Sequence, residues 1–281
     1  MLHPIISLTT DFGLRDPYVA EMKAVILRIC AEARIVDISH EISKYDVRMG
    51  AFALACAAPY FPEGTFHVAV VDPGVGTERQ PIIIQTPKGY YVGPDNGVLT
   101  LAARNDGGPE SIHKIANPKL ILSQVSSTFH GRDIFAPAAA HLANGTSPAE
   151  FGPKISKINK PAFAQVARER EALVGEVIHT DDFGNIITNL QPKDIQITRT
   201  QSTINIKIKN TRLGLKLCKT YGEVPQHKPL ALIGSHNFLE ISLNQDNAAK
   251  TYKTKTGDKI IVQLPQKTGK AKRVRKSMKF V

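Results

Sequence analysis

The sequence has no tryptophan and only three cysteines among its 281 residues. Cys30, Cys56 and Cys218 are widely separated, and none of them forms a CxxC pair. Because their number is odd and their spacing irregular, a disulfide framework and a zinc knuckle are both disfavoured. We therefore expect a cytoplasmic protein in which Cys30 and Cys56 act as small buried hydrophobic residues.

Long hydrophobic runs are missing as well. The longest, at residues 50–61, is interrupted by Pro59 and is too short to cross a bilayer. The N-terminal MLHPIISLTTDFG has no basic segment ahead of an apolar core, so we do not expect it to be a secretory signal. Neither a membrane anchor nor a membrane partner is predicted.

Several motifs that would indicate a metal or a cofactor are absent. The sequence has no HExxH pair for zinc, no GxGxxG for a dinucleotide and no GxSxG nucleophile elbow. Its glycine-rich segment VDPGVGTER lacks the GK[ST] ending of a phosphate-binding loop. We therefore expect no metal and no cofactor.

Positive charge, by contrast, is in excess, with a formal net charge of +11 at pH 7. Residues 266–281 hold seven Lys or Arg and no acidic residue, so the rest of the chain carries only +4. We interpret this segment as a basic, flexible tail that keeps the protein soluble. Non-specific contact of the tail with nucleic-acid phosphates is the alternative.

Strands and helices alternate through the first 150 residues. The predicted strands are 4–9, 35–38, 65–71, 82–85 and 90–92, and the predicted helices are 17–31, 46–59, 96–104 and 133–143. Such alternation predicts an α/β domain with a mainly parallel sheet flanked by helices. Ligands of these sheets bind at the carboxyl ends of the strands.

The pattern changes after residue 150. Residues 151–170 are rich in Lys and Pro and are interpreted as a linker. Residues 171–265 hold short strand-like runs and few helices, which fits a small antiparallel barrel or sandwich. The expected organisation is therefore a domain at 1–150, the linker, a second domain at 171–265 and the tail at 266–281.

Polar clusters follow two of the predicted strands. TTDFGLRD carries Asp11 and Asp16, which suit the hydroxyls of a ribose but are also explained by a turn and by Asp16 capping a helix that begins at Pro17. VDPGVGTER carries Asp72 and Arg79, and its glycines allow the backbone to approach a ligand closely. A tight turn with an Asp–Arg pair on the surface is the alternative.

Three further clusters complete the set. STFHGRD places His130 ahead of a helix, where capping does not account for it. In the second domain, DDFGN holds Asp181, Phe183 and Asn185, and GSHNF holds Ser235. Phe183 either joins the core or stacks on a base. These residues indicate a nucleoside-type site without metal, but composition and spacing do not specify a reaction.

Taken in order, the motifs resemble a known family. TTDFG, VVDPGVGTER, GPDNGVL, STFHGRD, DDFGNIITN and GSHNFLEISLNQDNAA occur in the order found in the S-adenosylmethionine (SAM) hydroxide adenosyltransferases, relatives of the fluorinases and chlorinases. The resemblance covers about residues 4–264. It implies an α/β N-terminal domain, a C-terminal antiparallel β-barrel, and a homotrimer whose sites lie between subunits. It also implies hydrolysis of SAM, as substrate rather than cofactor, to adenosine and methionine.

The resemblance also implies roles for single residues. Asp72, Arg79 and His130 match the set that handles the attacking water. The substrate-binding positions match Asp11 for the ribose, Asp16, Asp181 and Ser235 for the methionine part, and Phe183 and Asn185 for the adenine. The halogenating relatives lack the Arg–His pair and carry an insertion after the VDPGVG-like segment, which favours hydrolysis here. Family members commonly have Ser-x-Gly where this chain has Ser-His-Asn.

The expected mechanism is attack of a water on C5′ of SAM, opposite the bond to the sulfonium. Because histidine titrates near neutrality, we expect His130 to accept the proton while Asp72 and Arg79 hold the water. The alternative is that the three residues act as one coupled unit with no single base. Two other functions stay open: a halogenase that transfers chloride or fluoride to C5′, and a non-catalytic sensor that binds adenosine or SAM.

Overall fold

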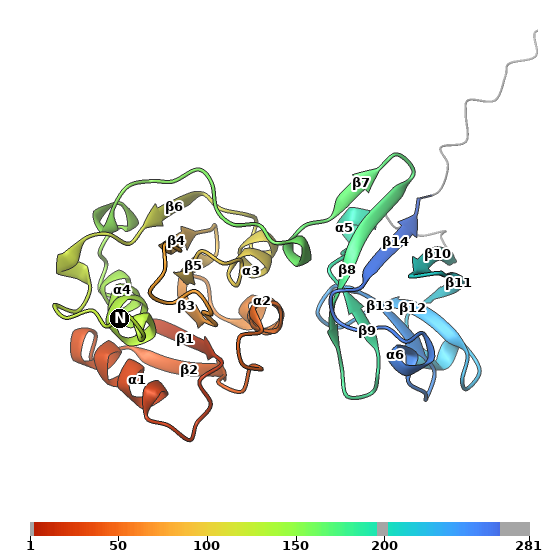
Figure 1. Ribbon diagram of the computed structural model, residues 1–281, viewed down its shortest axis with the longest axis horizontal. Helices are drawn as coiled ribbons and strands as arrows, with labels where there is room; N and C mark the ends of the chain where they lie inside the picture. The colour runs from red at the N-terminus through yellow and green to blue at the C-terminus, as the bar shows by residue number, and fades with distance from the viewer. Residues whose placement is uncertain (1–2, 196–201, 265–281) are drawn as a thin grey trace, which may run out of the picture.

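The computed structural model describes residues 3–195 and 202–264. The basic segment at 266–281 lies outside the described residues. The described chain forms two lobes joined by an extended connection (Figure 1). Among these residues, no helix is both long and apolar enough to cross a membrane.

The N-terminal lobe is built on a six-stranded sheet with the order β2-β1-β3-β5-β4-β6. Its strands are β1 (Ile5–Thr10), β2 (Arg34–Ser39), β3 (Thr65–Val70), β4 (Pro81–Gln85), β5 (Gly89–Pro94) and β6 (Ser111–Lys114). The pairs β2–β1, β1–β3 and β3–β5 are parallel, whereas β4 runs antiparallel to both β5 and β6. The predicted mainly parallel sheet is confirmed.

Helices cover both faces of this sheet. They are α1 (Tyr18–Ile29), α2 (Val47–Ala57), α3 (Thr100–Asn105) and α4 (Ala136–Ala143). Apolar side chains of α1 and α4 pack with Ile6 and Leu8 of β1 in one core, while those of α2 and α3 pack with Ile82 and Ile84 of β4 in a second core. The parallel strands therefore end at an edge that the helices leave open.

The start of α1 differs from the prediction. The N-cap is Pro17 rather than Asp16, and no side chain caps the helix. Pro17 has helical backbone angles, but the first residue of the helix is Tyr18. The carboxylate of Asp16 is therefore not used in capping.

The second lobe is a barrel. Its strands are β7 (Ala167–Glu169), β8 (Ala172–Thr180), β9 (Ile186–Thr188), β10 (Thr203–Ile208), β11 (Thr211–Cys218), β12 (Pro229–Ile233), β13 (Leu239–Leu243) and β14 (Lys259–Gln263). Pairing of β14 with β8 closes seven of them, and β7 lies outside against β8. The lobe also holds the short helices α5 (Pro192–Ile195) and α6 (Ala248–Thr251). The expected barrel is confirmed, with one parallel pair, β11–β12.

Three strands were not predicted, β6, β7 and β11. β6 and β7 have only four and three residues. β11 contains Gly214 and alternates Leu with Lys and Arg, which is a weak strand signal. The predicted helix at 96–104 begins later, at Thr100, and the predicted helix at 133–143 is preceded by a π-helical turn at Gly131–Phe135.

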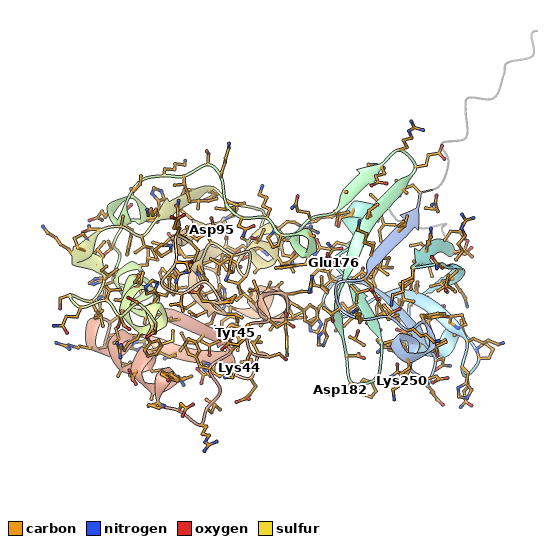
Figure 2. The ribbon with its side chains drawn as sticks, viewed as in Figure 1. Lys44, Tyr45, Asp95, Glu176, Asp182 and Lys250 are labelled. Carbon is orange, nitrogen blue, oxygen red and sulfur yellow. The ribbon has the colours of Figure 1, made fainter. Side chains whose placement is uncertain are left out.

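The two lobes touch through α2 and α3, and Arg104 of α3 forms an ion pair with Asp194 of α5. Phe52 of α2 stacks on His179 of β8, with ring centroids 4.7 Å apart, and also contacts Phe238. Arg48 of α2 forms an ion pair with Glu176 of β8, at the junction of the lobes (Figure 2). This contact is made within one chain and does not involve the open edge of the N-terminal sheet.

Candidate active site

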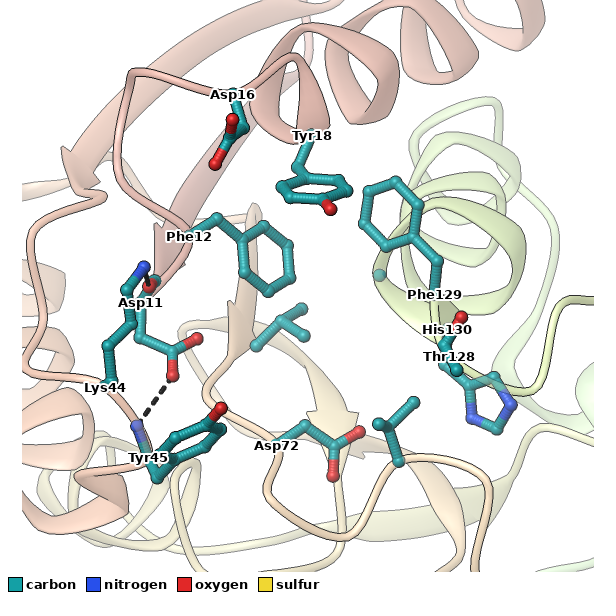
Figure 3. Close-up of a pocket in the computed structure, with 13 residues that line it drawn as sticks. Asp11, Phe12, Asp16, Tyr18, Lys44, Tyr45, Asp72, Thr128, Phe129 and His130 are labelled. Carbon is teal, nitrogen blue, oxygen red and sulfur yellow. Dashed lines mark hydrogen bonds between the residues drawn. The ribbon is translucent and has the colours of Figure 1, made fainter.

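A cavity of about 280 Å³ lies where β1 and β3 end. Figure 3 shows its polar side chains facing one another across a group of aromatic rings. The residues that line it are Asp11, Phe12, Asp16, Tyr18, Lys44, Tyr45, Val70, Asp72, Val75, Thr128, Phe129, His130 and Gly131. The cavity therefore brings together four of the predicted site residues, Asp11, Asp16, Asp72 and His130.

Arg79 links two of these residues from behind. Its Nε lies 3.0 Å from Oδ1 and 2.9 Å from Oδ2 of Asp72, and its Nη2 donates to Oδ2 as well. The same Nη2 lies 2.7 Å from Nδ1 of His130. One guanidinium thus fixes the carboxylate and the imidazole relative to each other.

This cluster is buried rather than on the surface. The side chains of Arg79 and Asp72 are 9% and 5% exposed. The guanidinium lies over the ring of Phe135, 5.2 Å from its centroid. The alternative of a surface Asp–Arg pair is therefore wrong. Arg79 itself does not line the cavity, and it reaches the cavity only through its contacts with Asp72 and His130.

The contact with Arg79 defines the protonation of His130. A guanidinium can only donate, so Nδ1 of His130 accepts and the ring proton of the neutral imidazole sits on Nε2. Burial and the charge of Arg79 lower the pKa of His130 from its ordinary value, while Asp72 and Asp133 act in the opposite direction. His130 is therefore neutral at pH 7 and presents an N–H.

The loops that carry these side chains approach closely at Gly76. This glycine has φ of +75°, and a Cβ there would lie 2.4 Å from the carbonyl oxygen of Ser127. The VDPGVG and STFHG segments can come together in this way only because position 76 has no side chain.

Asp11 is held in place from the opposite loop. Its Oδ2 accepts a hydrogen bond of 2.8 Å from the backbone N–H of Tyr45, and its carbonyl oxygen accepts one from Nζ of Lys44. Both interactions come from the segment between β2 and α2 (Figure 3). Among the described residues, the Asp16 carboxylate has no side-chain partner and lines the cavity.

The sequence analysis missed several residues of this cavity. Phe12, Tyr18 and Phe129 form an edge-to-face cluster, with centroids 5.1 to 6.0 Å apart. Lys44 and Tyr45 were not predicted as site residues, because they directly precede the predicted helix at 46–59. No pattern of residue types marks Lys44 and Tyr45, which lie in the segment between β2 and Asp46, the N-cap of α2.

The predicted residues of the second lobe lie in the barrel. The carboxylate of Asp181 accepts 2.8 Å and 2.9 Å hydrogen bonds from the backbone and side-chain nitrogens of Asn185. Both line a cavity of about 780 Å³ together with Phe183, whose side chain is 79% exposed. Ser235 lies in an adjoining cavity that shares Asp181. Phe183 is therefore not part of the core.

The two sets of predicted residues lie apart within one chain. No residue lines both the cavity of the N-terminal lobe and that of the barrel. Figure 2 shows Lys44 and Tyr45 in one lobe and Asp182, which lies between Asp181 and Phe183 in sequence, in the other.

The Ser-His-Asn segment keeps the backbone shape that a glycine would give. Asn237, at the position where glycine is common, has φ of +62°. Its N–H donates to the carbonyl of Gly234 at 2.9 Å, and the N–H of Gly234 donates to Phe238 at 2.9 Å. Asparagine tolerates left-handed angles better than other side chains do, so the turn is preserved.

Metal ligands do not gather in this protein within residues 3–195 and 202–264, where no three His, Cys, Asp or Glu side chains are placed to hold an ion. The polar groups of the N-terminal cavity are instead donors and acceptors suited to a ribose and a water.

Comparison with known proteins matches both lobes. The model of the SAM hydroxide adenosyltransferase N-terminal domain matches residues 6–152, and that of the C-terminal domain matches residues 175–261. A protein of Methanocaldococcus jannaschii named (R)-S-adenosyl-L-methionine hydrolase is 42% identical over 257 residues, 88% of this chain and 90% of that protein. One of the same name from Thermus thermophilus is 39% identical over 91% of this chain and 98% of that protein.

A more distant relative and a solved structure also match nearly the whole chain. A fluorinase of Nocardia brasiliensis is 28% identical over 93% of this chain and 97% of that protein. The crystal structure of a conserved protein from Thermotoga maritima superposes with a TM-score of 0.78 at 36% identity, covering 92% of this chain and 99% of that one. The chain belongs to the SAM hydroxide adenosyltransferase family.

Proposed function

We propose that the protein hydrolyses SAM to adenosine and L-methionine. The observation that supports this most is the Asp72–Arg79–His130 cluster, two members of which open onto the cavity that also holds Asp11. The relatives that are 39% and 42% identical are named as hydrolases of SAM. Asp11 would bind the ribose hydroxyls and Asp16 the methionine part.

The reaction needs an aligned water more than a strong base. The oxygen of the water forms a bond to C5′, the C5′–S bond breaks, and its electron pair stays on sulfur, which leaves as the neutral thioether of methionine. Because the sulfonium is already a good leaving group, no acid is required. Alignment of the two reacting atoms alone lowers such a barrier by several kcal/mol.

The structure changes our expectation for the proton. We expected His130 to accept it, but its Nδ1 is occupied by Arg79 and its Nε2 carries a proton. We therefore propose that His130 orients the water through Nε2–H and that Asp72 accepts the proton as the C–O bond forms. Arg79 keeps both groups in position.

The barrel residues belong to the proposal as the other half of the site. Phe183 would stack on the adenine, Asn185 would contact its edge, and Asp181 with Ser235 would bind methionine. Since these residues and the N-terminal cavity lie apart in one chain, we propose a homotrimer in which each site joins two subunits. The exposed rings of Tyr45 and Phe183, 71% and 79% exposed, support this, since a partner would cover them.

Three finer points complete the proposal. The names of the relatives specify the R configuration at sulfur, so we propose the R epimer of SAM as the preferred substrate. No metal or cofactor takes part, and the protein acts in the cytoplasm, where its three unpaired cysteines stay reduced.

The test is turnover of each SAM epimer in water enriched in oxygen-18. We expect labelled adenosine, and we expect Asp72→Asn to lower kcat by about 10²–10⁴-fold while binding of SAM is largely retained. Glu78→Gln is the matched control, since Glu78 is an exposed acid in the same loop. Binding without turnover would indicate a sensor, and a 5′-halogenated product in excess chloride or fluoride would indicate a halogenase. Either result would contradict the proposal.

A further inference from the structure

A chain of polar contacts lies under the loop that carries Asp11. Oγ1 of Thr10, at the end of β1, is 2.9 Å from Nδ1 of His40. Nε2 of His40 is 3.0 Å from Oδ1 of Asp37 in β2, and Nζ of Lys23 in α1 is 2.6 Å from Oδ2 of Asp37. We call Thr10, His40, Asp37 and Lys23 the His40 array.

The donor and acceptor of each hydrogen bond in the array can be assigned from the tautomer of His40. The carboxylate of Asp37 favours the proton of the ring on Nε2, although this N–H is not well aligned with Oδ1, so the contact is mainly electrostatic. Nδ1 of His40 then accepts from the hydroxyl of Thr10, and Oγ1 of Thr10 accepts from the backbone N–H of Phe12 at 3.2 Å. The Thr10 hydroxyl therefore donates to His40 and accepts from Phe12.

The surroundings of the array favour a fixed geometry. The side chain of His40 is only 2% exposed. Burial raises the pKa of Asp37, but Lys23 and His40 together hold it below its usual value, so the carboxylate remains charged. The pairing of β1 with β2 shifts register after Leu8 and Asp37, which places His40 beside the end of β1.

The array is connected directly to the segment that lines the cavity. The carbonyl oxygen of His40 accepts a 2.7 Å hydrogen bond from the N–H of Gly13. His40 therefore holds residues 10–13 through both its side chain and its backbone, and Asp11 lies between these two attachments. The Tyr45 N–H that binds the Asp11 carboxylate comes from the same loop as His40.

We propose that His40 is a positioning residue that sets the Asp11 carboxylate for the ribose hydroxyls and thereby determines selectivity for ribose over 2′-deoxyribose. The inference rests on the proposed function, because it takes Asp11 as the ribose-binding group. His40 does not line the cavity, so it acts on the substrate only through the Asp11 loop.

The same strand provides a matched control. Ser7 of β1 lies 2.7 Å from Nδ1 of His67, a buried histidine of β3 that stacks on Tyr91. Burial lowers the pKa of His67 to about 4, so it is neutral near pH 7. The two pairs share a hydroxyl–imidazole contact on β1, but the Ser7–His67 pair is not connected to the Asp11 loop.

The experiment measures the Kd of the full-length protein for adenosine and for 2′-deoxyadenosine by calorimetry. In the wild type we expect adenosine to bind about 10- to 100-fold more tightly, as a hydrogen bond to a charged group allows. His40→Leu should bring the two Kd values to within about threefold, whereas His67→Leu should lower Tm and keep the wild-type ratio.

Thr10→Val and Thr10→Ser provide a second route if His40→Leu does not fold. Thr10→Val removes the hydroxyl and should reduce the ratio, and Thr10→Ser restores the hydroxyl and should restore the ratio. An unchanged ratio in His40→Leu or in Thr10→Val overturns the inference, as does an equal fall in His67→Leu or a wild type that does not discriminate.

Because these are binding measurements, they are independent of turnover. Failure of the wild type to release adenosine from SAM would contradict the proposed function. The ratio of the Kd values for 2′-deoxyadenosine and adenosine would still test the role of His40.

Discussion

At the scale of single residues, the site depends on the shape of Arg79. Its planar guanidinium reaches both oxygens of Asp72 and the Nδ1 of His130 at once. An ammonium group has the same charge but no fork, so it cannot hold two groups at fixed angles. Under the proposed mechanism, the geometry of the arginine, and not only its charge, is therefore needed to orient a water between Asp72 and His130.

Arg79→Lys tests this requirement. We expect kcat to fall by about 10²-fold or more because the water loses its alignment, with little change in the Kd of SAM, since Arg79 does not line the cavity. The measurement is adenosine release under single-turnover conditions. Arg104→Lys is the control, because Arg104 binds Asp194 and Gln191 away from the cavity. Full activity in Arg79→Lys would show that charge alone is enough.

The pH dependence of the reaction also follows from these contacts. His130 accepts from Arg79 only in its neutral form, so the contact is intact above the pKa of His130 and is lost as the pH falls through it. Since burial and Arg79 lower this pKa below the ordinary 6.5, the acid limb of kcat/KM should lie below pH 6.5. An acid limb above that value would contradict the assignment.

A second variant checks the cause of the shift. Arg79→Gln removes one of the two effects that lower the pKa of His130 and leaves Asp72 and Asp133, which raise it. The pKa of the His130 ring, followed by NMR, should therefore be higher in Arg79→Gln than in the wild type. If it does not rise, Arg79 does not control the protonation of His130.

How far single residues could be predicted depends on what each one contacts. Asp72, Arg79 and His130 come from segments up to 58 residues apart in sequence, and local patterns favoured a turn and a surface pair. Only the order of the motifs identified them as one group. Lys44 and Tyr45 escaped because they interact with Asp11 largely through a backbone N–H and a backbone carbonyl, which leave no pattern in the sequence.

At the scale of elements, the Asp72–Arg79–His130 cluster forms where two loops contact each other. The loop after β3 carries Asp72 and Arg79, and the loop before the π-helical turn carries His130. Their closest approach is at Gly76, where a Cβ would lie 2.4 Å from the carbonyl oxygen of Ser127. Backbone does not yield as a flexible side chain does, so any larger residue must push the loops apart.

Gly76→Ala should therefore separate Arg79 from His130 and reduce kcat by about 10²-fold or more. Gly64→Ala is a matched control, because Gly64 also has positive φ, +83°, but a Cβ there meets nothing within 4 Å. Both variants should lose about 1 kcal/mol of unfolding free energy from backbone strain. Activity and denaturant unfolding are measured together, and equal activities in the two variants would argue against the loop contact.

The elements themselves were largely predictable where their pattern was strong. β1, β3 and α2 could be predicted because their own apolar residues recur at the spacing of a buried strand or helix. The prediction that Asp16 caps α1 is wrong. Its residue type and position are typical of an N-cap, but in the fold its side chain lines a cavity. β11 was missed because its outward face is basic and it contains Gly214. Such strands are stabilised by pairing with their neighbours, which the sequence does not reveal.

At the scale of the whole molecule, the predicted site residues line separate cavities in the two lobes. The contact between the lobes includes Phe52, the Arg48–Glu176 pair and the Arg104–Asp194 pair, and no barrel residue lines the N-terminal cavity of the same chain. The proposed site between two subunits would account for the division of the polar residues and for the exposed rings near both cavities. In a closed ring, each subunit then contributes its two halves to two different sites.

Mixing two inactive variants tests this arrangement. Asp72→Asn disables the N-terminal half and Asp181→Asn disables the barrel half, and the two are co-expressed and purified together. If sites join neighbouring subunits, about a quarter of the sites in random trimers combine two intact halves, so about a quarter of wild-type kcat should return. If each chain made its own site, every site would carry one defect and no activity would return. Light scattering of the same sample gives the number of chains, and a mass other than three chains would rule out the trimer even if activity were restored.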